Sequence, residues 1–78
     1  MRYVQNSRIV KIDRPFITLG QLLKEEGIIP TGGAAKWFLR EHDVKINDEL
    51  DQRRGKKLYP GDKVEIVGVE TVTIQGEQ

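Results

Sequence analysis

The residue types that could carry chemistry in this chain are few, and most of them are cations. The segment 53–57 reads Arg-Arg-Gly-Lys-Lys and places four cations around one glycine. Arginine pairs with phosphate through two parallel hydrogen bonds and lysine adds a point charge, so such a loop suits a nucleic-acid backbone. Charge runs also occur as solvated, solubilising loops, so the run alone leaves both interpretations open.

A second candidate anion site is the segment 31–36, which reads Thr-Gly-Gly-Ala-Ala-Lys. Its threonine suits a helix N-cap, and its two glycines leave main-chain amides uncovered where the helix dipole favours an anion. Lys36 and Arg40 are spaced to fall together on one flank of that helix. Taken alone, however, the glycine pair favours a tight turn or close helix packing over a ligand site.

Trp37 lies roughly opposite the centre of the apolar stripe that Ala35, Phe38 and Leu39 form on the second helix. An aromatic side chain there could stack on an unpaired base. Small proteins seldom leave tryptophan exposed, so we expect the N-terminal segment or a terminal strand to cover it.

The composition provides few residues for a nucleophilic active site or a metal site. The chain has no cysteine, one histidine, His42, and one serine, Ser7, which nothing in the sequence places beside that histidine. We interpret His42 as a helix-end residue that interacts with the dipole and the core. No Walker loop or dinucleotide fingerprint is present. We therefore expect a protein that is not an enzyme, with no catalytic residue, no metal site and no cofactor.

The elements that must position these residues follow from local patterns. A capping box at Thr18 and Gln21, followed by leucines at helical spacing and Gly27, predicts a helix over 18–26. Pro30 ends the linker, and the second helix begins at the 31–36 segment. Strands are expected near 8–13, at 44–46 with a turn at 47–48, at 64–67, and at 69–74, where Val72 and Ile74 face one way and the threonines the other.

Length and charge set the remaining bounds. With 78 residues, 37% of them hydrophobic, the chain should fold as one domain, 1–78, with a single thin core. It shows no apolar run long enough to span a membrane and no signal peptide. The net charge of +1 argues against bulk attraction to polyanions, but residues 52–63 carry five Lys or Arg and one Asp, a local +4.

The order of these parts resembles the RNA-binding domain first described in ribosomal small-subunit protein four, which pseudouridine synthases, tyrosyl-tRNA synthetase and heat-shock RNA-binding proteins share. It is most similar to the stand-alone bacterial members of the YaaA/YbcJ group. The resemblance covers 18–67 and rests on four segments: Gly32-Gly33-Ala34-Ala35-Lys36, Val44-Lys45-Ile46-Asn47, Arg53-Arg54-Gly55-Lys56-Lys57-Leu58 and Pro60-Gly61-Asp62-Lys63-Val64.

The resemblance implies an α+β fold: a two-helix αL motif packed on a small, mostly antiparallel sheet of about four to five short strands. In that family the two helices and the following hairpin form an L-shaped surface that grips RNA. Carried over by position, the implied RNA contacts are Thr31, Gly32, Gly33, Lys36, Arg40, Lys45, Asn47, Arg53, Arg54, Lys56 and Lys57.

Two departures from the family pattern bear on that surface. Many members have Ser-Arg where this chain has Thr31-Gly32, which removes a phosphate-binding arginine and leaves more of the affinity to the 53–57 loop. Many also have Asn-Gly where this chain has Asn47-Asp48, which places a carboxylate beside the expected surface.

We therefore predict a non-catalytic module that binds structured RNA, ribosomal or transfer RNA, in the bacterial cytoplasm, linked to ribosome assembly or translation. No membrane partner is expected, and the sequence names no protein partner. Two alternatives stay open. The Pro-Gly-Asp-Lys-Val-Glu-Ile segment also occurs in β-grasp sulfur carriers, although this chain lacks their Gly-Gly end. The acidic tail and Trp37 fit a protein-interaction adaptor.

Overall fold

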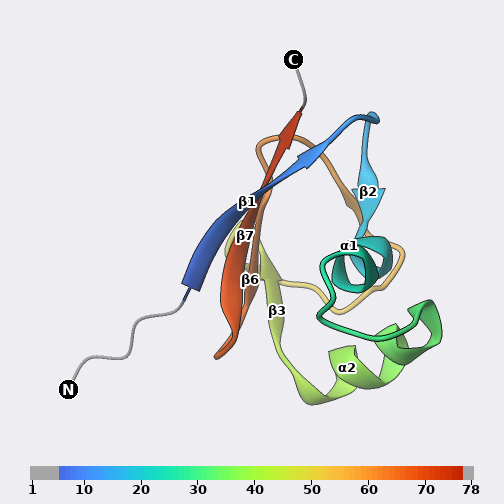
Figure 1. The fold of residues 1–78 in the computed structure, drawn as a ribbon. Helices are drawn as coiled ribbons and strands as arrows, with labels where there is room; N and C mark the ends of the chain where they lie inside the picture. The colour runs from blue at the N-terminus through green and yellow to red at the C-terminus, as the bar shows by residue number, and fades with distance from the viewer. Residues whose placement is uncertain (1–5, 77–78) are drawn as a thin grey trace.

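A five-stranded sheet forms one layer of the computed structural model, which describes residues 6–76 (Figure 1). Its strands lie in the order β1-β7-β6-β3-β4. Their bounds are Asn6–Ile12 for β1, Val44–Ile46 for β3, Glu49–Leu50 for β4, Lys63–Ile66 for β6 and Glu70–Gly76 for β7. Neighbours are antiparallel except β1 and β7, which run parallel. The α+β class and the mostly antiparallel sheet are confirmed.

Both helices lie to one side of this sheet (Figure 1). Helix α1 spans Leu19–Glu25 and α2 spans Ala35–Glu41, preceded by the 3₁₀ turn η1, Gly32–Ala34. A second, two-stranded antiparallel sheet joins β2, Ile17–Thr18, to β5, Lys57–Leu58. This small sheet brings Lys57 and Leu58, the end of the basic segment, directly to the start of α1.

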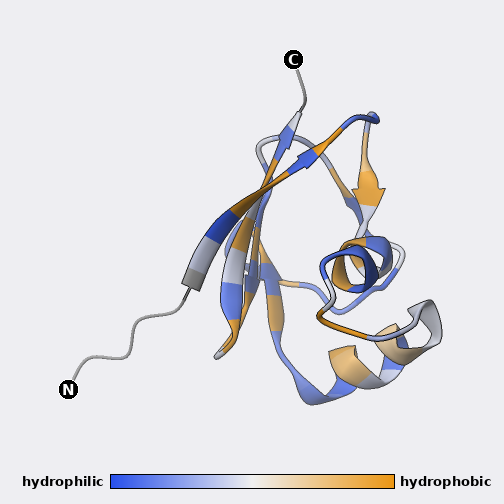
Figure 2. Cartoon of the chain, viewed as in Figure 1, coloured by the Kyte–Doolittle hydropathy of each residue, from blue (hydrophilic) through white to orange (hydrophobic). Residues whose placement is uncertain are grey.

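Alternation along the strands produces the core. Val64 and Ile66 of β6 and Val72 and Ile74 of β7 are buried, as the two-residue period requires. Leu19, Leu22 and Leu23 of α1 are fully buried and meet the same cluster from the helix side. Hydrophobic and hydrophilic colours accordingly alternate along the strands in Figure 2.

The capping box at the start of α1 is confirmed. The Gln21 amide donates to Thr18 Oγ1 at 3.3 Å, and the Thr18 amide donates to Gln21 Oε1 at 3.0 Å. Gly27 has a φ of 74°, the left-handed conformation that stops the chain after α1. Asn47 and Asp48 have φ values of 53° and 70°, so the predicted turn between β3 and β4 is a left-handed two-residue hairpin.

The second helix begins differently from the prediction. Thr31 occupies the N-cap position of η1, but its side chain makes no capping hydrogen bond, and α2 itself starts only at Ala35. The Ala34 amide instead donates to the Thr31 carbonyl oxygen at 3.1 Å, which closes the 3₁₀ turn. Gly32 and Gly33 therefore form a tight turn, as we expected for the glycine pair taken alone.

Candidate nucleic-acid interface

The loop of residues 51–56, which connects β4 to β5, is fixed to the start of α1 by its own carbonyl groups. The Gly20 amide donates to the Arg54 carbonyl oxygen at 2.8 Å, and the Leu19 amide donates to that of Lys56 at 2.9 Å. The first amides of a helix have no partner within the helix, so the loop supplies acceptors that α1 lacks. The loop and the first turn of α1 therefore form one unit.

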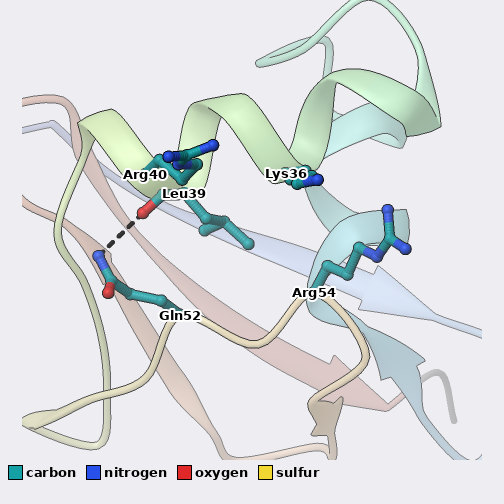
Figure 3. A pocket seen from close by; sticks show the side chains of 5 residues that line it. All are labelled: Lys36, Leu39, Arg40, Gln52 and Arg54. Carbon is teal, nitrogen blue, oxygen red and sulfur yellow. Dashed lines mark hydrogen bonds between the residues drawn. The ribbon is translucent and has the colours of Figure 1, made fainter.

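The same loop is tied to α2 by one side chain. Gln52 Nε2 donates to the Leu39 carbonyl oxygen at 2.8 Å, the contact drawn as a dashed line in Figure 3. The carbonyl lies in the second half of α2, which spans Ala35–Glu41. The 51–56 loop therefore spans the gap between the two helices and holds its side chains at a fixed position relative to both.

Between α2 and this loop lies a hollow of about 500 Å³, lined by Lys36, Leu39, Arg40, Gln52 and Arg54. We call it the α2–loop hollow. Lys36 and Arg40 come from α2, and the Arg54 side chain extends from the facing loop toward the helix (Figure 3). The predicted helix flank and one residue of the predicted basic loop thus meet at one place, with Leu39 as an apolar wall.

Two arginines of the N-terminal half serve the fold. Arg8 of β1 contacts Glu26 at 3.1 Å and Glu70 at 2.9 Å, and Arg14 contacts Glu25 at 2.9 Å. Within residues 6–76, by contrast, no carboxylate forms an ion pair with any cation of the α2–loop hollow. The positive charge of the hollow is therefore available to an external anion.

Arg53, the first residue of the predicted basic loop, is engaged locally. Its guanidinium donates to both carboxylate oxygens of Asp51, at 2.7 and 3.0 Å, and its amide donates to Oδ1 at 3.0 Å. The hydrogen bonds from the Arg53 side chain lower the pKa of Asp51 to about 2, and the pKa of Arg53 is raised in turn. Arg53 is exposed, but its charge is compensated by its neighbour.

Lys56 and Lys57 line a second hollow, of about 490 Å³, which acidic and amide side chains also line. Its other lining residues are Ile46, Asn47, Glu49, Asp51, Tyr59 and Asp62. Lys57 Nζ also lies 4.9 Å from the centre of the Phe16 ring. The structure therefore divides the 53–57 run: Arg54 faces α2, whereas the two lysines share a surface with carboxylates.

The remaining predicted contacts lie apart from the α2–loop hollow. Lys45 is exposed between buried Val44 and Ile46, so it points to the sheet face opposite the helices. The Asn47 side chain bonds to the neighbouring segment at the start of β6: it donates to Asp62 at 3.1 Å and accepts from the Lys63 amide at 3.0 Å. Thr31, Gly32 and Gly33 are exposed and line neither hollow.

Trp37 is 62% exposed, so the described strands leave it open, contrary to the expectation that a terminal strand covers it. The prediction also named the N-terminal segment as a possible cover, but residues 1–5 lie outside the described residues. Lys36 Nζ lies 6.0 Å and Arg40 Cζ 5.2 Å from the centre of the indole ring. His42 ends α2 half-buried, its ring stacked on Phe38 at 4.2 Å, in agreement with a helix-end role.

The described part of the chain contains no group of acidic, histidine or cysteine side chains that could hold a metal ion. No helix in it is long and apolar enough to cross a membrane.

Comparison with known proteins covers almost the whole described chain. Residues 10–75 match the family model of the S4 domain, a longer stretch than the 18–67 on which the sequence resemblance rests. Over 59 residues the chain is 61% identical to the probable ribosome maturation protein RlbA of Bacillus subtilis (strain 168). That alignment covers 76% of this chain and 83% of the relative.

Proposed function

The chain belongs to the S4 domain family, and from this premise we propose that it is a non-catalytic protein that binds structured RNA during ribosome assembly. The name of the Bacillus relative refers to ribosome maturation, which favours ribosomal RNA over transfer RNA as the ligand. A role of this kind needs an anion-binding surface of defined shape and no reactive group.

The observation that carries the proposal is the set of cations around the α2–loop hollow. Lys36, Arg40 and Arg54 come from two elements that the hydrogen bond from Gln52 to Leu39 links, and no described carboxylate pairs with them. Folded RNA presents phosphates and 2′-hydroxyls in fixed relative positions, so a rigid arrangement of cations can read its shape without contacting base edges.

The remaining sequence-predicted contacts complete the proposed surface with smaller contributions. Lys56 and Lys57 extend it past the loop, although the neighbouring carboxylates of the second hollow reduce their attraction for phosphate. The same reduction applies to Arg53, which its Asp51 partner compensates. Thr31, Gly32 and Gly33 form the periphery of the proposed surface. Lys45, on the sheet face away from the helices, and Asn47 contribute only where the RNA extends past this surface.

The test compares two double variants that each remove two charges. Lys36→Ala with Arg54→Ala removes cations of the hollow, whereas Lys11→Ala with Lys24→Ala removes exposed cations elsewhere. Binding to a ribosomal RNA fragment is measured by fluorescence anisotropy over a series of salt concentrations. The first variant should lower both the affinity and the salt slope, by roughly one slope unit per lost phosphate contact. Equal effects of the two variants would contradict the proposal.

Neither alternative function has an observation of its own. Family membership accounts for helix α2, which a β-grasp sulfur carrier leaves unexplained. A protein-interaction adaptor predicts binding to a protein partner that survives removal of the basic charges, so the same variants tested against a protein partner separate it from RNA binding.

A further inference from the structure

The single tryptophan of the chain lies on the surface, where it contributes nothing to the hydrophobic core. Trp37 is 62% exposed on α2, while Ala35 and Leu39 of the same helix are buried in the core. Exposing an indole forgoes the favourable burial of a large apolar surface, so its position calls for a partner outside the described fold.

The charge around the ring identifies the chemistry of that partner. Lys36 Nζ and Arg40 Cζ lie 6.0 and 5.2 Å from the ring centre, and both residues also line the α2–loop hollow. The ring and the hollow therefore adjoin through these two side chains, with the flat aromatic ring on one side of them and the cationic hollow on the other. A nucleotide has the complementary layout, because its base has a flat π face and its phosphate lies one sugar away.

We propose that Trp37 is a stacking platform for one unpaired nucleotide of the RNA, whose adjoining phosphates lie against Lys36, Arg40 and Arg54. The inference rests on the proposed function and adds the class of ligand: RNA with a bulged or looped-out base. Within a perfect duplex both faces of each base are stacked, so only an unpaired base can offer a face to the indole. Stacking on an aromatic side chain strengthens binding by roughly five- to a hundredfold per base.

The sole tryptophan makes the contact directly measurable, because its fluorescence reports on this ring alone. The probes are a fully paired RNA duplex and the same duplex with one bulged adenosine, titrated against wild type, Trp37→Ala and Trp37→Phe. The side chain is exposed, so neither substitution removes core packing, and circular dichroism checks the fold. We expect wild type to bind the bulged duplex roughly five- to a hundredfold more tightly and its emission to be quenched only by that duplex.

Trp37→Ala should bind both duplexes with the affinity that wild type has for the paired one, and Trp37→Phe should keep part of the preference. A wild type that binds both duplexes equally, with binding still lost in Lys36→Ala/Arg54→Ala, would overturn the inference and leave the proposed function standing. Emission that ignores RNA but shifts when ribosomal proteins are added would also overturn it and assign the ring to a protein contact. Failure of the wild type to bind either duplex would overturn both.

Discussion

The main-chain amide of Gly20 donates to the carbonyl oxygen of Arg54 at 2.8 Å, which joins the first turn of α1 to the residue that completes the α2–loop hollow. A Cβ at position 20 would lie 3.2 Å from that oxygen and 3.5 Å from the Arg54 Cβ. The glycine therefore permits the close approach that places the Arg54 guanidinium opposite α2.

Gly20→Ala should weaken RNA binding several-fold. The new methyl group has to push back the Arg54 carbonyl, and two further hydrogen bonds, from Gln52 and from the Leu19 amide to Lys56, hold the loop in place. The free energy of unfolding should change by less than about 1 kcal/mol, because better helix propensity offsets the strain. Anisotropy and urea unfolding measure the two effects separately.

Gly55→Ala is the matched control, since it adds the same methyl group to the same loop. A Cβ at Gly55 meets no atom within 4 Å, and that glycine has no positive φ. Affinity and stability should stay at the wild-type level. A loss of binding as large as that of Gly20→Ala would show that any added methyl group disturbs the loop. It would contradict the idea that the close approach of Gly20 to Arg54 is what matters for binding.

Gln52 provides a test of the tether between the loop and α2. Both Gln52→Leu and Gln52→Glu remove the donor to the Leu39 carbonyl and should each lower the unfolding free energy by about 1 kcal/mol. Only the glutamate adds a negative charge to the hollow, beside Arg40 and Arg54. The affinity for RNA should therefore fall further in Gln52→Glu, with a shallower salt dependence. Identical binding by the two variants would mean that RNA does not approach this hollow.

Most of the fold was predictable because its causes are local. The capping box of Thr18 and Gln21 and the left-handed stop at Gly27 lie within a few residues of the helix they delimit. Two-residue alternation marks β6 and β7. The strands β2, β4 and β5 have two residues each, too few to show alternation, and their pairing depends on segments distant in sequence.

The candidate site was predictable only in composition. Lys36 and Arg40 share a helix flank because of the helical period, and the basic run is evident in the sequence. The division of that run has one local and one tertiary cause. Asp51, two residues away, binds Arg53, and the unpaired amides at the start of α1 bind the Arg54 and Lys56 carbonyls. Gln52 was missed because a lone glutamine in a loop shows no pattern. That the described strands leave Trp37 open depends on where those strands pack, which no local pattern shows.

The Asp51–Arg53 pair makes a specific contribution to the dependence of stability on pH. The pKa of Asp51 is about 2 in the folded protein, below its ordinary value of 3.8, because Arg53 donates to the ionised carboxylate. A lowered folded pKa stabilises the fold above about pH 4, and this stabilisation is lost as the pH falls toward 2. Wild type should therefore be more stable than Asp51→Asn at neutral pH, with a difference that shrinks over that interval.

Urea unfolding at several pH values measures this difference, and added salt should reduce it because the Arg53 side chain is 72% exposed. Arg53→Gln should cause a similar loss, and the double variant no more than either single one. Asp51→Asn also frees the Arg53 guanidinium, so its affinity for RNA should rise slightly at neutral pH. Additive losses in the double variant would show that the two side chains stabilise the fold independently.

The cations around Trp37 should also be detectable without any RNA. Iodide and caesium both quench indole fluorescence by collision, but they carry opposite charges. Because Lys36 and Arg40 lie within 6.0 Å of the ring centre, iodide should accumulate at the exposed indole and caesium should be repelled. Iodide is the more efficient quencher of free indole as well, so the iodide-to-caesium quenching ratio should be several-fold higher for the protein than for the uncharged model compound N-acetyltryptophanamide, and this excess should shrink as salt is added. Lys36→Ala with Arg40→Ala should lower the iodide-to-caesium quenching ratio, whereas Lys11→Ala with Lys24→Ala should leave this ratio unchanged. A wild-type ratio equal to that of N-acetyltryptophanamide would mean that the indole has no cationic surroundings in solution. The proposed layout of base and phosphate on this helix would then lose its basis.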